Sequence, residues 1–159
     1  MNSVVHFEMP YKDRQRMARF YEKAFGWHTR DLGEAMGHYV LATTTETDER
    51  GPTRPGAING GFYSPKPDFP APFPAVVIGV DDLAAAMQQV RDGGGTVLGE
   101  PMEIPDYGHY VSFTDTEGNR VALMEPLPHH KAVAKERAVR VPAREERAEA
   151  VAIAQPATA

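Results

Sequence analysis

The chain has 159 residues, 42% of them hydrophobic and 25% charged, a composition that supports one packed domain with or without a tail. It has no cysteine, which excludes disulfides, thiolate nucleophiles and zinc–thiolate sites. Residues 1–128 hold 11 basic and 18 acidic side chains, a charge of −7 against −5 for the whole chain, so we expect no general affinity for nucleic acid.

The sequence carries no signal for export or membrane insertion. The opening MNSVVHFEMP lacks the basic patch and apolar run of a signal peptide. No stretch approaches the roughly 18 apolar residues that a membrane-spanning helix needs. We therefore expect a cytoplasmic protein with no membrane partner.

The first half of the chain predicts a strand, a helix and three more strands. Residues 4–9 alternate, with His6 and Glu8 on one face of a strand and apolar residues on the other. A helix follows, from a cap at Asp13 to a stop at Gly26, because its apolar residues recur at helical spacing. Further strands are predicted at 27–30, 37–43 and 56–63, with a polar loop at 44–55.

A proline-rich linker separates this half from a second one. Five prolines within residues 64–74 disfavour the centre of a sheet and favour an extended chain. The pattern then restarts with a strand at 75–80 and a helix from a cap at Asp82 to the glycines at 93–95. Three strands follow, at 96–98, 107–114 and 119–125.

The two halves match in pattern at an offset of 69 residues. This offset places His6 on Ala75, Asp13 on Asp82 and Gly26 on Gly95. The repeat predicts an α+β fold of two tandem β-α-β-β-β modules, at about residues 3–63 and 75–127, within a domain of residues 1–128. The charged, alanine-rich tail at 129–159 is predicted to be flexible from its composition.

Four segments resemble the vicinal oxygen chelate superfamily of glyoxalases, bleomycin resistance proteins and extradiol dioxygenases. They are VVHFEMP, RFYEKAFGW, VVIGVDDLAAAMQQV and SFTDTEGNRVALMEP, and the resemblance covers about residues 3–127. It implies that the two modules form a curved, eight-stranded pair of half-barrels around a central cavity. It also implies a homodimer, because many members complete their pockets by dimerising.

The resemblance also implies where a divalent metal would be held. The corresponding positions are His6, Asn59, Ala75 and Ala122. His6 keeps a ligand type, Asn59 is a weak oxygen donor, and the alanines have no ligand atom. We therefore expect the family metal site to be largely lost, with His6 the one ligand type retained. A divalent metal with a reduced ligand set is the alternative.

His6 and Glu8 are the candidate catalytic residues, because two titratable groups on one inward strand face need a reason to be there. They could act as an acid/base pair, or as one ligand with its orienting partner. The alternative is an inert polar pair at the rim of a pocket. Burial in an apolar cavity is expected to raise the Glu8 pKa unless a protonated His6 opposes it.

The other inward positions are small or apolar apart from the amide of Asn59, and they predict a ligand cavity with few polar groups. These are Asn59, Gly61, Ala75, Val77, Ala122 and Met124. The resemblance places Tyr107, His109 and Tyr110 beside this cavity, where aromatic rings could stack on a flat ligand. The alternative is that larger side chains from other strands fill the space.

The sequence leaves three functions open. The first is a protein that binds a small organic molecule in the cavity, and the acidic body would suit a cationic one. The second is a lyase, isomerase or dioxygenase-type enzyme that uses His6 and Glu8, with or without a divalent metal. The third is a regulatory or interaction subunit whose tail docks a partner.

Overall fold

The computed structural model describes residues 1–65 and 73–128 of the chain, and Met1–Leu127 form one compact unit. The tail predicted at 129–159 and the middle of the proline-rich linker lie outside the described residues. Within the described residues, no helix is both long and apolar enough to cross a membrane.

The first module contains one helix and the four sheet strands predicted for it. Its elements are β1 (Val4–Pro10), α1 (Arg14–Phe25), β2 (His28–Asp31), a short 3-10 helix (Glu34–Met36), β3 (Val40–Thr43) and β6 (Asn59–Tyr63). The segment predicted as a loop at 44–55 instead holds a small hairpin, β4 (Thr47–Asp48) and β5 (Gly51–Pro52). Two-residue strands show no alternation, which explains why the sequence pattern missed them.

The second module repeats this plan. Its elements are β7 (Ala75–Gly79), α2 (Leu83–Asp92), β8 (Thr96–Ile104), β9 (Gly108–Thr114) and β10 (Arg120–Pro126). β8 is longer than the predicted 96–98, because the chain pairs again with β9 after an irregularity between Leu98 and Met102. Gly99 (φ 74°) and Pro101 lie in that irregularity and break the alternation that would have marked the strand.

The helices begin as the repeat predicts but end differently. Asp13 and Asp82 both cap their helices by accepting a hydrogen bond from the backbone N–H three residues later. α1 stops at Gly26, which adopts the left-handed conformation. α2 stops at Gly93, the first of the three glycines predicted to end it, and so has 10 residues where α1 has 12.

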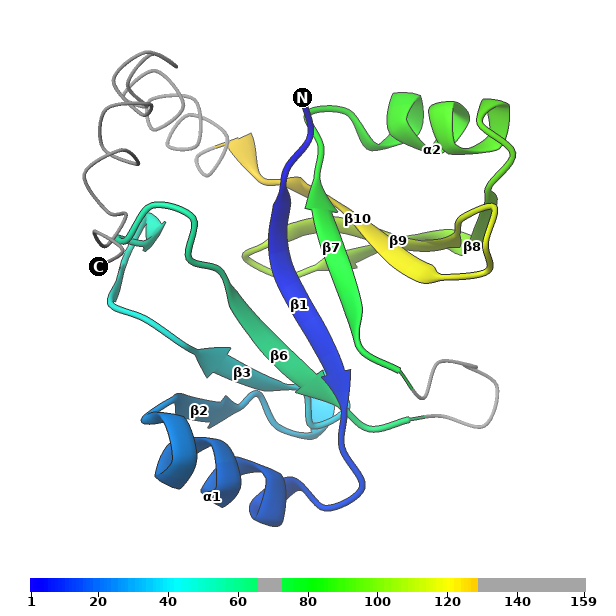
Figure 1. The fold of residues 1–159 in the computed structure, drawn as a ribbon. Coiled ribbons are helices and arrows are strands. Elements are labelled where there is room, and N and C mark those ends of the chain that lie inside the picture. Colours follow the sequence, from blue (N-terminus) through cyan, green and yellow to red (C-terminus); the bar gives the residue numbers. More distant parts are fainter. Residues whose placement is uncertain (66–72, 129–159) are drawn as a thin grey trace, which may run out of the picture. The chain divides into compact units, whose positions relative to one another are not determined.

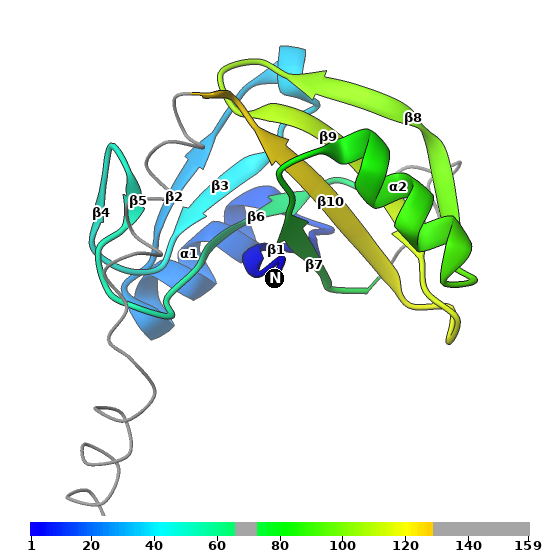
Figure 2. The same ribbon diagram turned by 90° about the horizontal axis from the view of Figure 1, so that it is seen from above.

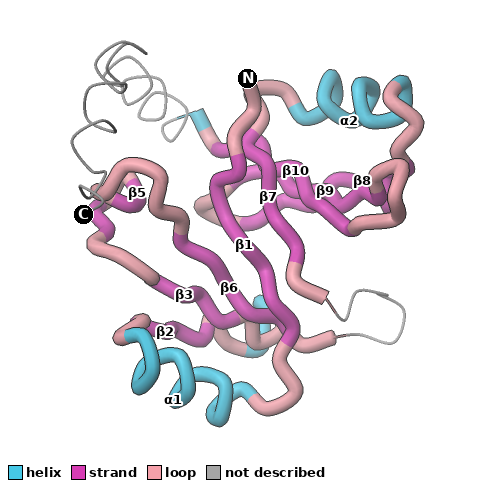
Figure 3. Tube along the Cα trace, in the orientation of Figure 1, coloured by secondary structure: helices cyan, strands magenta, loops and turns pink. Residues whose placement is uncertain are grey.

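The two modules join in a single eight-stranded sheet through β1 and β7, which pair antiparallel at its centre. The strand order is β2-β3-β6-β1-β7-β10-β9-β8, so each module contributes four adjacent strands. Figures 1 and 2 show the sheet curving, with α1 and α2 on its outer side. The tube in Figure 3 shows the same arrangement, with β1 and β7 running between the two helices. The sheet is open at β2 and β8.

Two hydrophobic cores lie between the outer face of the sheet and the helices. Under α1, buried Val40, Ala42 and Phe62 are surrounded by partly buried aromatic rings, including Phe7 and Trp27. Under α2 the buried residues are mostly aliphatic, namely Val80, Leu83, Ala86, Met87, Val111, Phe113 and Leu123. The alternation of each strand therefore directs one set of apolar residues outward into these cores, and its other side chains, polar and apolar, face the inner side of the curve.

Candidate functional site

The strand registers bring most of the predicted site residues to the inner face of the sheet. His6 stands opposite Asn59 on β6 and Val77 on β7, and Glu8 stands opposite Gly61 and Ala75. Val77 is in turn paired with Ala122 on β10. Residues paired in register share a face, so both titratable groups and the small residues around them lie together where β1 meets β7.

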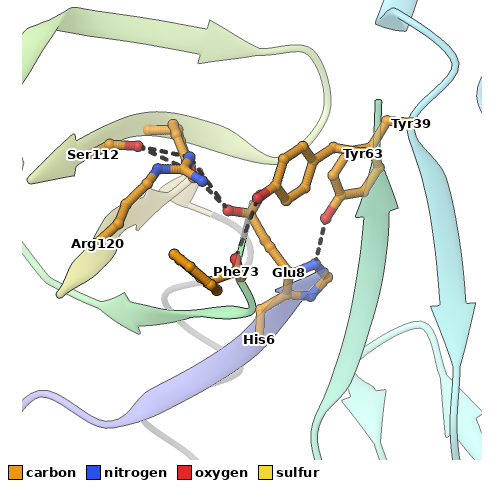
Figure 4. Close-up of polar contacts among 8 residues, drawn as sticks. His6, Glu8, Tyr39, Tyr63, Phe73, Ser112 and Arg120 are labelled. Carbon is orange, nitrogen blue, oxygen red and sulfur yellow. Dashed lines mark hydrogen bonds and ion pairs between the residues drawn. The ribbon is translucent and has the colours of Figure 1, made fainter. Parts of the chain in front are cut away.

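Side chains from both modules meet on this face in one hydrogen-bonded cluster, which we call the seam network. It consists of His6, Glu8, Tyr39, Tyr110, Ser112 and Arg120. The Tyr110 hydroxyl donates to Glu8 Oε2 at 2.8 Å, and His6 Nε2 lies 2.9 Å from the Tyr39 hydroxyl. Figure 4 shows Glu8 between His6 and Tyr39 on one side and Arg120 and Ser112 on the other.

The second module supplies its part of the network through strand alternation. On β9, Val111 and Phe113 belong to the core under α2, so Tyr110 and Ser112 face inward. Arg120 opens β10, two residues before Ala122 and on the same face. The first module supplies Tyr39 from the end of a turn in which Gly37 and His38 both have positive φ.

Glu8 is held in an environment that disfavours its charge. It is 8% exposed and, with Ser112, is one of the two buried polar side chains among the residues that the structure describes. Desolvation raises the pKa of its carboxyl, opposed by the Tyr110 hydrogen bond, the Arg120 charge and the Tyr39 hydroxyl. The expected upward shift of the Glu8 pKa is thus confirmed.

His6 does not act as a cation near Glu8 at neutral pH. Desolvation lowers the pKa of its imidazole to about 4, so the ring is neutral at pH 7. Burial, reinforced by the Glu8 charge, raises the pKa values of the Tyr39 and Tyr110 hydroxyls far above neutrality. Both tyrosines therefore remain protonated, which allows each hydroxyl to donate a hydrogen bond.

Arg120 provides the positive charge of the network. Its Nη2 donates to Ser112 Oγ at 3.0 Å and to the Tyr110 hydroxyl at 3.1 Å, and it lies 3.9 Å from Glu8 Oε2. The guanidinium also lies over the ring of half-buried Tyr63, 5.6 Å from its centroid. These contacts hold the guanidinium in a fixed orientation, and its side chain is only 10% exposed.

Larger side chains cover the small residues that were expected to line a roomy cavity. A Cβ on Gly61 would overlap the ring of Tyr39, so this ring lies directly against the Gly61 backbone. Tyr110 packs with Val77 and Ala122 in a small core of its own. Two surface cavities of about 390 and 250 Å³ lie elsewhere, one beside the start of α2 and one at Trp27.

Two predicted ligand-binding residues, Asn59 and His109, have other surroundings, and a third, Tyr107, lies near Tyr39. The Asn59 amide accepts a hydrogen bond from the Thr44 backbone N–H and donates to the Thr47 hydroxyl, so it fixes the start of the β4–β5 hairpin. His109 alternates with Tyr110 and lines the 390 Å³ cavity beside α2. Tyr107 precedes β9 and is 41% exposed, and it lies near enough to Tyr39 to contribute to the raised pKa of that hydroxyl.

The residues at the positions implied for a metal do not fit one. Ala75 and Ala122 offer no ligand atom, the Asn59 amide is engaged with the hairpin, and His6 Nε2 contacts Tyr39. In the described part of the chain, no three or more His, Cys, Asp or Glu side chains are grouped so that they could hold a metal ion. We derive no metal-dependent step for this site.

Tyr39, Ser112 and Arg120 were not predicted as site residues, and Tyr110 was considered only as one of three aromatic residues. The alternation of β9 contained a signal, because Tyr110, Ser112 and Thr114 form a polar face opposite Val111 and Phe113. Arg120 directly follows a hairpin turn, where an arginine is normally a solvated surface residue. Its inward direction follows only from the register of β10.

The family comparison agrees with this architecture. Residues 3–123 match the model of the Glyoxalase/Bleomycin resistance protein/Dioxygenase superfamily. The chain belongs to that superfamily. The resemblance and the fold class predicted from the sequence are therefore confirmed.

Named relatives carry the same family label. A glyoxylase-like domain-containing protein of Didymella fabae is 32% identical over 119 residues, which cover 73% of this chain and 88% of that protein. The protein CFP32 of Mycobacterium bovis, which carries a glyoxylase name, is 30% identical over 121 residues. The match covers 74% of this chain but only 43% of CFP32.

Solved structures share the fold. A methylmalonyl-CoA epimerase bound to methylmalonyl-CoA superposes with a TM-score of 0.60 at 19% identity, over 80% of this chain and 96% of that one. Identity at this level supports the shared fold only, because one fold hosts many functions.

Proposed function

We propose that this protein binds a small organic molecule on the inner face of the sheet, against the seam network. One observation carries the proposal. Glu8 of the first module and Arg120 of the second are brought together, largely buried, on the inner face of the sheet, beside small residues such as Gly61 and Ala122 that tyrosine rings cover. Burying ionisable groups costs free energy, and such groups concentrate at functional sites.

The composition of the inner face supports this proposal. Apolar Val77, Ala122 and Met124 surround a few fixed polar groups, which is the usual make-up of a small-molecule site. Tyr39 and Tyr63 supply aromatic rings beside those polar groups. We propose that the ligand takes the space now covered by the Tyr39 ring, since Gly61 beneath it carries no side chain.

Tyrosine labelling provides a test with internal controls. The chain has six tyrosines, of which Tyr39, Tyr63 and Tyr110 belong to or contact the network. Ring-labelled protein would be screened by NMR against a library of small acids, amides, amines and thiols. A ligand of the proposed site shifts these three signals and leaves those of Tyr11 and Tyr21 unchanged. A library in which no compound shifts the three signals would refute the proposal.

A second candidate is proton-transfer catalysis of the lyase or isomerase kind. It is favoured by the carboxyl of Glu8, whose pKa is raised and which is linked through tyrosine hydroxyls to a neutral His6. A carboxyl tuned toward neutral pH can take a proton from carbon and return it. Deuterium exchange from solvent into carbonyl compounds, followed by NMR, would detect this step. Glu8→Gln should lower such exchange by about a hundredfold or more.

The homodimer and the cytoplasmic location stay predictions. Sedimentation of the purified protein would measure the oligomeric state, and a mass of one chain at micromolar concentration would contradict the dimer. The reading as a regulatory subunit depends on the tail at 129–159, which lies outside the described residues.

A further inference from the structure

The seam network is rich in hydrogen-bond donors. Arg120 is a donor only, and the hydroxyls of Tyr39, Tyr110 and Ser112 can each donate. Glu8 is the one acceptor-only group of the network when it is ionised, and the Tyr110 hydroxyl already donates to it. A ligand that adds acceptor atoms would therefore use this network better than a ligand that adds donors.

The charge of the network also favours a ligand that is rich in hydrogen-bond acceptors. Arg120 is the only cation of the network at pH 7, because the His6 ring is neutral, and burial disfavours the negative charge of Glu8. A cationic ligand would approach a cation already fixed 3.9 Å from the Glu8 carboxylate and would have to compete with it. The local charge thus points in the opposite direction to the acidic body, whose excess negative charge suggested a cationic ligand.

The contacts of Arg120 also suit its guanidinium to binding an anion. Ser112 and Tyr110 hold one end of its guanidinium, which lies over the Tyr63 ring at 5.6 Å from the centroid. A planar guanidinium with a fixed orientation can bind carboxylate oxygens with little further loss of side-chain entropy. The surrounding Val77 and Ala122 lower the local dielectric constant and strengthen the attraction.

We propose that the ligand of this site is a small organic carboxylate, or a similarly acceptor-rich oxygen anion, and that Arg120 is the residue that binds it. The inference rests on the proposed function, since it names the ligand class of the same site. Glu8, on this account, disfavours anions that do not also engage Arg120.

Three flat probes of one skeleton test the charge preference: benzoate, benzamide and benzamidine. Their dissociation constants would be measured by calorimetry or NMR at pH 7 with the full chain. We expect benzoate to bind at least threefold more tightly than benzamide and at least tenfold more tightly than benzamidine. Benzamidine binding as tightly as benzoate would overturn the inference.

Variants then assign the preference to Arg120. Arg120→Gln should weaken benzoate binding by about tenfold or more, the loss typical of one charge-assisted hydrogen bond, and should change benzamide binding little. Arg120→Lys keeps the charge without the planar fork and should retain part of the affinity. A partial loss in this variant would show that the larger loss in Arg120→Gln is not caused by a folding defect.

Glu8→Gln should strengthen benzoate binding severalfold. Arg16→Gln, on the exposed surface of α1, is the matched control and should change nothing.

The outcomes separate this inference from the function on which it rests. If uncharged or cationic library compounds shift the Tyr39, Tyr63 and Tyr110 signals while benzoate does not, the site binds small molecules and only the assignment to anions fails. If benzoate binds with equal affinity to wild type and both Arg120 variants, the role of Arg120 is refuted. If no compound of any charge reaches these tyrosines, both proposals fail.

Discussion

The two modules share one backbone plan but reach it with different side chains. α1 has no buried residue and covers its half of the sheet through contacts among aromatic rings, such as Tyr21 stacked on Trp27 at 4.7 Å between centroids. α2 buries Leu83, Ala86 and Met87 in an aliphatic core. The fold therefore depends on which face of each strand is apolar, and much less on which apolar residues are used.

The inner face shows a sharper contrast between the modules. The first supplies the carboxyl of Glu8, and the second supplies the guanidinium of Arg120 with the hydroxyls that orient it. Neither half holds a balanced polar site alone. The two repeats therefore differ most in the side chains of the inner face, while their outer faces support the shared fold.

The largest expected effect concerns the aromatic core of the first module. Phe62 is 1% exposed and packs on Phe7 and Tyr21. Phe62→Ala should lower the free energy of unfolding by about 3–5 kcal/mol, because it removes a fully buried ring and leaves a cavity. Phe73→Ala, at a side chain that is 73% exposed, is the control and should cost under about 0.5 kcal/mol. Equal losses in urea denaturation would contradict this assignment of the core.

The next effect is acid sensitivity caused by His6. Its folded-state pKa of about 4 lies below the usual 6.5, so its contribution to stability is present above pH 6.5 and is lost as pH falls toward 4. At about 1.4 kcal/mol per pKa unit, the loss between pH 7 and pH 5 is roughly 2 kcal/mol. The raised pKa of Glu8 acts in the opposite direction, since its unfavourable ionisation costs stability as pH rises above 4.5.

His6→Gln isolates the imidazole from the other titrating groups. The difference in unfolding free energy between pH 7 and pH 5 should change by roughly 2 kcal/mol in this variant relative to wild type. His28→Gln, on the exposed strand β2, should leave the pH dependence as it is. An unchanged pH dependence in His6→Gln would show that the imidazole is not desolvated.

Coupling between the modules is the third expectation. In a double-mutant cycle of Glu8→Gln and Arg120→Gln, the unfolding free energies should be non-additive by about 1–3 kcal/mol, because each single variant leaves the other side chain without its oppositely charged neighbour. Additive effects would mean that the two side chains are neighbours that do not interact energetically.

The smallest effect tests how Tyr39 lies on Gly61. A methyl group at Gly61 would overlap the Tyr39 ring, so Gly61→Ala should cost about 1–2 kcal/mol as the ring is displaced. The same substitution in a Tyr39→Ala background should cost much less. If Gly61→Ala costs the same in both backgrounds, the ring does not occupy the space above Gly61.

Much of the fold could be predicted because local sequence patterns determine its strands and its helix ends. The alternation of residues 4–9, the aspartate caps at Asp13 and Asp82 and the stop at Gly26 each act locally, and all were recovered. The β4–β5 hairpin and the second half of β8 were missed. The hairpin strands have only two residues each, and an irregularity between Leu98 and Met102 interrupts β8, so neither segment shows a strand periodicity.

The candidate site was only half predictable. His6 and Glu8 could be found because their strand is near-regular and its inward face is polar. Arg120 and Ser112 could not, since their meeting with Glu8 depends on the register of four strands spread over 112 residues of sequence. Likewise Gly61 and Ala122 suggested an empty cavity, and only the three-dimensional arrangement brings the Tyr39 ring onto Gly61 and Tyr110 onto Ala122.

A crystal structure of the protein with its best-binding small carboxylate would test the central claim most directly. The account predicts density for the ligand on the inner face, with a carboxylate oxygen within hydrogen-bond distance of Arg120 and the Tyr39 ring moved from Gly61. Density confined to the cavity at His109 and Glu125, or to the one at Trp27, with the seam network unchanged, would contradict it.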